Sequence, residues 1–211
     1  MQRCVRICRV VFIMSKMCAW ASMSEAGTID GTPGDQTGNE VKRGDWYQFG
    51  QDEVFRWKNE ALGRMAAALA GGIANNDHVG YGQSDRLTFF YAWRAVNYDI
   101  SRVTSDVNVD CSAFICAIVN ACGIPCDPSG TTYNMASVLG ATGQFDRYTG
   151  SSWTDSDTLL RAGDIVCNSQ RHVIMVTDDV EPAIGPVDPS GYGVTPVGIF
   201  QIFLKKKRQI V

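Results

Sequence analysis

The chain has 211 residues, of which 45% are hydrophobic and 19% charged, a composition that supports a buried core and excludes a disordered chain. Eight of the 19 basic residues lie in residues 1–16 and 205–211, whereas all 22 acidic residues lie between these ends, where the net charge is about −11. This charge repels a phosphate backbone, so we expect no nucleic-acid partner. No apolar run reaches the roughly 20 residues of a membrane-spanning helix, so we expect no stable membrane insertion.

The first eighteen residues differ from the rest of the chain. Three arginines precede the apolar run 10–14, as in a secretory signal peptide, but Ser15 and Lys16 interrupt this run early. We therefore predict that residues 1–18 form a dispensable leader or upstream extension, with a signal peptide doubtful. A single domain over 19–204 and a basic tail over 205–211 complete the predicted organisation.

Helices are predicted for the first half of the domain. Residues 19–50 are rich in glycine and poor in aliphatic anchors, which predicts a long arm of loops. An apolar stripe at helical spacing from Val54 to Leu69 predicts a first helix, and a second is expected between Ser84 and Asn97. A third begins at Asp110-Cys111-Ser112 and closes at Gly123. A short fourth helix is expected over 131–139.

Strands are predicted after the helices. The period of the hydrophobic pattern becomes two over 164–166, 172–177 and 197–204, which are rich in Ile, Val and Phe. Helices followed by strands indicate an α+β fold, in which N-terminal helices pack on a C-terminal antiparallel sheet.

Cys111 and His172 are candidates for nucleophilic catalysis. A cysteine at a helix start is stabilised as thiolate by free N–H groups and the helix dipole. A cysteine on an apolar helix is more often a core residue, as Cys116 and Cys122 illustrate. However, Gly163-Asp164 and a short strand lead to His172 at the head of a second strand, where a base can meet a helix N-terminus. We expect a thiolate–imidazolium pair near neutral pH.

The other cysteines suggest a limited role. Cys122 and Cys126 flank Gly-Ile-Pro and could form a disulfide in an oxidising compartment. With only two histidines in the chain, a zinc site would need thiolates from scattered positions. We expect no metal and no cofactor.

Three motifs carry a family resemblance: Asp110-Cys111-Ser112-Ala113-Phe114, the run 160–166 (Leu-Arg-Ala-Gly-Asp-Ile-Val), and the run 171–176 (Arg-His-Val-Ile-Met-Val). Together they resemble the NlpC-like branch of the papain-like cell-wall cysteine peptidases, a branch that includes many phage and prophage endolysins. The stretches 21–47 and 79–86 are also similar to such lysins.

The resemblance implies a papain-like NlpC-type fold and cleavage of an amide bond in the peptide part of bacterial peptidoglycan. Cys111 is then the nucleophile and His172 the general base. The backbone N–H of Cys111 and of Ser112 would bind the oxyanion, and Tyr81 would help to polarise the scissile carbonyl. The alternative for Tyr81 is a turn aromatic that packs on the core.

A third member that orients the imidazole is harder to place. Asp178 and Asp179 lie about 20 Å beyond His172 along an extended strand. Asp188 follows a predicted hairpin turn and is the preferred candidate.

Asp35, Gln36 and Trp46 of the arm are candidate substrate contacts, because a stem peptide with amine and carboxylate groups needs polar partners. The alternatives are an Asp that caps a turn and a Trp that covers the core. The expected partner is the peptidoglycan stem peptide, and the protein is expected to be a monomer that acts on the cell wall after synthesis in a host cytoplasm or secretion. An acyltransferase on the same fold and a catalytically silent wall-binding module remain alternatives.

Overall fold

A computed structural model describes residues 15–23, 27–178 and 180–185. Its main feature is a six-stranded sheet in the order β2-β1-β8-β7-β3-β6, in which every neighbouring pair is antiparallel. The strands are β1 (Met17–Ala21), β2 (Val41–Asp45), β3 (Glu53–Trp57), β6 (Phe145–Thr149), β7 (Ile165–Asn168) and β8 (His172–Val176).

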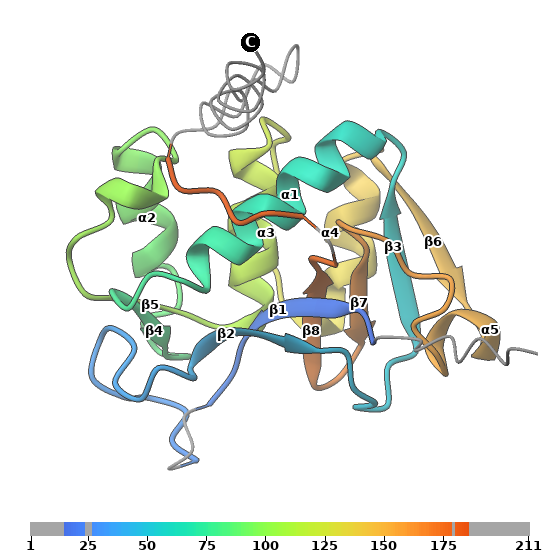
Figure 1. Cartoon of the computed structure of the whole chain (residues 1–211), viewed down its shortest axis with the longest axis horizontal. Helices are drawn as coiled ribbons and strands as arrows, with labels where there is room; N and C mark the ends of the chain where they lie inside the picture. Colours follow the sequence, from blue (N-terminus) through green and yellow to red (C-terminus); the bar gives the residue numbers. More distant parts are fainter. Residues whose placement is uncertain (1–14, 24–26, 179, 186–211) are drawn as a thin grey trace, which may run out of the picture.

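The helices pack mainly on one face of this sheet. Helices α1 (Glu60–Ile73) and α3 (Cys111–Ala121) lie against β1 and β8, as Figure 1 shows. Helix α2 (Thr88–Ala95) packs beside a small parallel sheet of β4 (Val79–Tyr81) and β5 (Val107–Val109). Two shorter helices are α4 (Met135–Ala141) and α5 (Ser151–Thr154). Two 3-10 turns cover Ile100–Arg102 and Thr132–Asn134.

Both faces of the six-stranded sheet are buried. Along β8, Val173 and Met175 join the core under the helices, whereas Ile174 and Val176 join a second core on the opposite face. Half-buried aromatic side chains cover that second core: Trp46, Tyr47, Phe49, Tyr148 and Trp153. Burial on both sides explains why β1, β7 and β8 are nearly continuous apolar runs, whereas the outer strands β2 and β6 carry polar residues that are not buried.

The α+β class and the third helix agree with expectation. Asp110 caps α3, since its Oδ1 accepts a hydrogen bond from the Ala113 N–H at 2.7 Å. Beyond the helix end, Gly123 takes a positive φ of 79°, which glycine adopts without steric cost. The second and fourth expected helices are present as α2 and α4, each with shifted bounds.

The predicted order of helices before strands is wrong, because β1, β2 and β3 all precede α1. Residues 19–50 are therefore not only loops. In β1 the residues Cys18, Ala19 and Ala21 are fully buried between the two cores, and such small side chains leave no visible alternation. The helix expected from Val54 is in fact β3, followed by α1 with the N-cap Asn59.

The start of the domain also differs from expectation. Strand β1 begins at Met17, and Cys18 pairs with Val176 of β8, so the domain includes the last two residues assigned to the leader. The expected strand 197–204, the tail 205–211 and most of the leader lie outside the described residues. In the described part of the chain, no helix is long and apolar enough to cross a membrane.

Candidate active site

The N-terminus of α3 is held by an ion pair. Arg86 Nη1 donates to Asp110 Oδ2 at 2.7 Å, and Asp110 Oδ1 accepts from the Ser112 hydroxyl at 2.9 Å as well as from the Ala113 N–H. Arg86 also donates to the carbonyl oxygens of Ser129 and Gly130. These contacts fix the first turn of the helix, where Cys111 is the first residue.

Cys111 lies in contact with the start of β8. Only 7% of its surface is exposed, and burial raises the pKa of its thiol to about 12, with a smaller contribution from the Asp110 carboxylate. Hydrogen bonds from the backbone N–H groups of Val173 and Ser112 act in the opposite direction. The contact with Val173 places the sulfur next to the residue that follows His172.

His172 is neutral at neutral pH. Burial lowers the pKa of its imidazole to about 4. The ring packs edge-on against Phe49, with centroids 5.4 Å apart. Its Nε2 atom is buried and has no hydrogen-bond partner within the described residues. Burial thus disfavours both charges of the expected thiolate–imidazolium pair.

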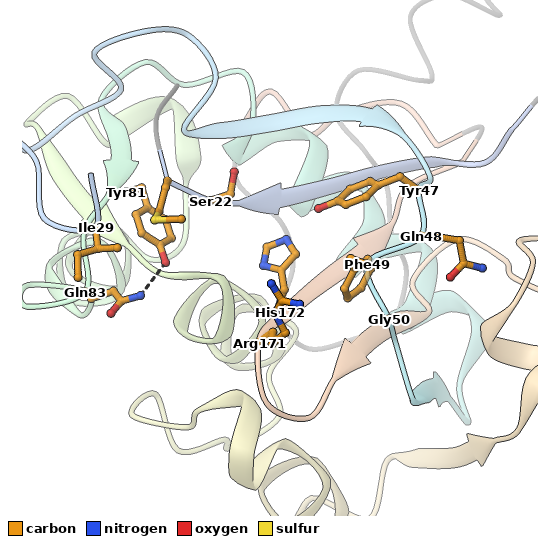
Figure 2. Close-up of a pocket in the computed structure, with 11 residues that line it drawn as sticks. Ser22, Ile29, Tyr47, Gln48, Phe49, Gly50, Tyr81, Gln83, Arg171 and His172 are labelled. Atoms are coloured by element: carbon orange, nitrogen blue, oxygen red, sulfur yellow. Dashed lines mark hydrogen bonds between the residues drawn. The ribbon is translucent and has the colours of Figure 1, made fainter. Parts of the chain in front are cut away.

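An open cleft of about 570 Å³ is lined by His172, whereas Cys111 is not among its lining residues. Figure 2 shows His172 in the middle of the cleft, with Tyr81 on one side and Tyr47 on the other. Burial raises the pKa of both tyrosines to about 12, and a negative charge on Cys111 adds to the effect at each. The lining residues are Ser22, Met23, Ile29, Tyr47, Gln48, Phe49, Gly50, Tyr81, Gln83, Arg171 and His172.

Tyr81 is held by a single side-chain partner. Gln83 Nε2 donates a hydrogen bond of 3.1 Å to the Tyr81 hydroxyl oxygen (Figure 2). Because the oxygen accepts this bond, the hydroxyl hydrogen remains available for a group bound in the cleft.

Two predicted contacts of the arm lie elsewhere. The Asp35 carboxylate accepts hydrogen bonds from backbone N–H groups of its own loop, at residues 37, 38, 39, 40 and 41. Gln36 Nε2 donates to the carbonyl oxygens of Pro33 and Gly34, each at 3.1 Å. Neither residue lines the cleft, so both side chains stabilise the loop.

The arm contributes Tyr47 to the cleft instead of Trp46. Trp46 packs on the second core, on the face of the sheet opposite α1 and α3. Tyr47 and Phe49 also pack on the second core and in addition line the cleft, although no sequence pattern singled them out among the chain's aromatic residues. Asp188 lies outside the described residues, and Asp178 forms an ion pair with Lys16 at 2.7 Å, at the far end of β8.

The cysteines of the described residues are all free thiols, so Cys122 and Cys126 are not bridged. Cys126 instead forms a side-chain hydrogen bond with Cys116. Within the same part of the chain, no group of three or more His, Cys, Asp or Glu side chains is placed to hold a metal ion.

Comparison with protein families identifies the class. A family model described as an endolysin-like domain matches residues 18–183, so the chain belongs to the endolysin-like domain family. Membership indicates a cell-wall-related function of the kind found in phage endolysins. Comparison with curated proteins and with solved structures gives no match.

Proposed function

We propose that the chain is a peptidoglycan hydrolase that cleaves an amide bond in the stem peptide, with Cys111 as nucleophile and His172 as general base. The observation that carries this proposal is the contact of the Cys111 thiol with the backbone N–H of Val173, directly after His172, beside an open cleft that His172 and Tyr81 line in a chain of the endolysin-like family.

Because Cys111 and His172 are both neutral before the reaction, the proton of the thiol moves to His172 and then to the leaving amine. His172 takes the thiol proton of Cys111 as the sulfur attacks the carbonyl carbon of the scissile amide. The resulting oxyanion is stabilised by a backbone N–H at the start of α3 and by the Tyr81 hydroxyl. The imidazolium then gives its proton to the leaving amine, and a thioester of Cys111 forms.

Water completes the cycle. His172 accepts a proton from the water molecule that attacks the thioester carbonyl, and the thiol is restored when this proton returns to sulfur. The low pKa of His172 keeps the imidazole unprotonated and able to accept a proton at neutral pH before substrate binds, and the same burial makes it a weaker base than an exposed histidine.

The test is hydrolysis of purified peptidoglycan, followed by mass spectrometry of the released fragments. Cys111→Ala should release none, while Cys122→Ala, which removes a buried thiol just beyond the other end of α3, should release the same fragments as the parent. Equal release by Cys111→Ala and the parent protein would overturn the assignment of the nucleophile.

A further inference from the structure

The charge of the cleft differs from the charge of the protein. Among the described residues that line the cleft, Arg171 is the only one with a formal charge at neutral pH, since His172 is neutral. The segment between the basic ends of the chain carries a net charge of about −11. The cleft of this acidic protein therefore contains a positively charged residue, Arg171, whose neighbours in the lining are mainly aromatic and amide side chains.

The guanidinium of Arg171 has no partner of its own. The residue is exposed, and within the described part of the chain it forms no ion pair or side-chain hydrogen bond. Lys16, Arg56, Arg86 and Arg147, in contrast, each form an ion pair with a carboxylate. Arg171 can therefore bind an anion without breaking an existing contact.

The backbone that carries Arg171 is fixed. It lies in the tight turn between β7 and β8, where its N–H donates to the Asn168 carbonyl at 3.1 Å. Asp52 accepts hydrogen bonds from the N–H and the hydroxyl of Ser169, and the Asn168 amide donates to the Gly50 carbonyl. The Asp52 carboxylate is thus already hydrogen-bonded to Ser169. The hydrogen bonds of this turn fix the backbone position of Arg171 next to His172 (Figure 2).

We infer that Arg171 is a specificity-determining residue, which binds a free carboxylate of an acidic stem peptide and so selects acidic over amidated substrates. This inference rests on the proposed function, because it assigns the substrate of the same cleft. The planar guanidinium can form two parallel hydrogen bonds with a carboxylate, and an amide at that position offers one acceptor and no charge.

The test compares two soluble stem peptides that differ only in whether their side carboxylates are free or amidated. The parent protein should have a higher kcat/KM on the acidic peptide. Arg171→Gln should lower kcat/KM on this peptide by about 10- to 100-fold, the loss expected for one charge-assisted pair, and change it by less than about threefold on the amidated peptide. Arg171→Lys should retain part of the preference.

The matched control is Arg102→Gln, since Arg102 is also exposed but lies outside the cleft, in the 3-10 turn Ile100–Arg102. It should keep the parent's preference. An equal loss on both peptides in Arg171→Gln, or an unchanged preference, would overturn the inference.

Binding separates this inference from the proposed function. If the parent protein cleaves neither peptide, the hydrolase proposal fails, and titration calorimetry with the same two peptides still tests Arg171. Tighter binding of the acidic peptide that is lost in Arg171→Gln and retained in Arg102→Gln would support the carboxylate site. Equal affinity for the two peptides in the parent would refute it.

Discussion

The neutral state of His172 predicts a measurable loss of stability in acid. The imidazole has a pKa of about 4 in the folded protein and about 6.5 in an unfolded chain. Below pH 6.5 the unfolded chain therefore binds more protons than the folded protein, and the free energy of unfolding decreases as the pH is lowered. Above pH 6.5 both states are neutral at this position, and His172 contributes no pH dependence.

The size of the effect follows from the two pKa values. At pH 5, proton binding to the unfolded state lowers the free energy of unfolding by about 2 kcal/mol relative to pH 8, and the loss approaches about 3 kcal/mol well below pH 4. Carboxylates add their own acid dependence, so the quantity to compare is the difference between the parent and His172→Gln.

Urea unfolding followed by circular dichroism at pH 8 and pH 5 provides the assay. The free energy of unfolding of His172→Gln minus that of the parent should be about 2 kcal/mol higher at pH 5 than at pH 8. This change does not depend on how much the substitution itself alters stability at pH 8. His78→Gln, which changes an exposed histidine paired with Asp106, should leave the acid loss from His172 in place. A parent-to-His172→Gln difference that is constant with pH would refute the claim that burial keeps the imidazole neutral.

Four further outcomes are expected. Because burial raises the pKa of Cys111 to about 12, its alkylation by iodoacetamide should speed up about tenfold per pH unit from pH 7 to 10, and a plateau between pH 5 and 8 would indicate a thiolate–imidazolium pair instead. Tyr81→Phe should lower kcat on peptidoglycan fragments by about 100-fold with little change in KM or stability, and an unchanged kcat would remove Tyr81 from the mechanism. Asp35→Ala should lower the free energy of unfolding by about 1–3 kcal/mol yet leave kcat/KM of the folded protein unaltered; a selective loss of kcat/KM would show that Asp35 contacts substrate. A chain that starts at Ser15 should unfold at the same urea concentration as the full chain, whereas one that starts at Ser22 lacks β1 and should not fold; failure of the first would show that residues 1–14 contribute to the structure.

The helices that depend on local signals could be predicted from the sequence. Asp110 and Gly123 mark the two ends of α3 by capping and by positive φ, and these are properties of single residues and their immediate neighbours. The strands β7 and β8 were equally visible, because both are short runs rich in Ile and Val, although their direct pairing was not predicted. The position of Cys111 and the head of β8 followed from these elements.

The strands of the arm could not be predicted, because their pairing is long-range. β1 is built of small residues and lies between β2 and β8, which are separated from one another by more than a hundred positions in the chain. Its burial on both faces depends on the helices and on the aromatic cover. No local pattern carries that information.

The same reason limited the prediction of the site. Tyr47 and Trp46 are adjacent and both pack on the second core, but only Tyr47 lines the cleft, and this difference depends on the tertiary arrangement beyond the end of β2. The Asp35 carboxylate is occupied by its own loop, a contact that the sequence left open beside a substrate role. Arg171 became a candidate only when its position in the cleft was known.

The central claim is that Cys111 forms a covalent intermediate with the acyl part of a peptidoglycan stem peptide. Acid quenching in the first turnovers, followed by digestion and mass spectrometry, measures this directly. The account predicts an adduct with the mass of the acyl fragment on the peptide that contains Cys111, absent in Cys111→Ala and present in Cys122→Ala. Release of wall fragments by the parent protein with no adduct on Cys111, and at the same rate in Cys111→Ala, would contradict it.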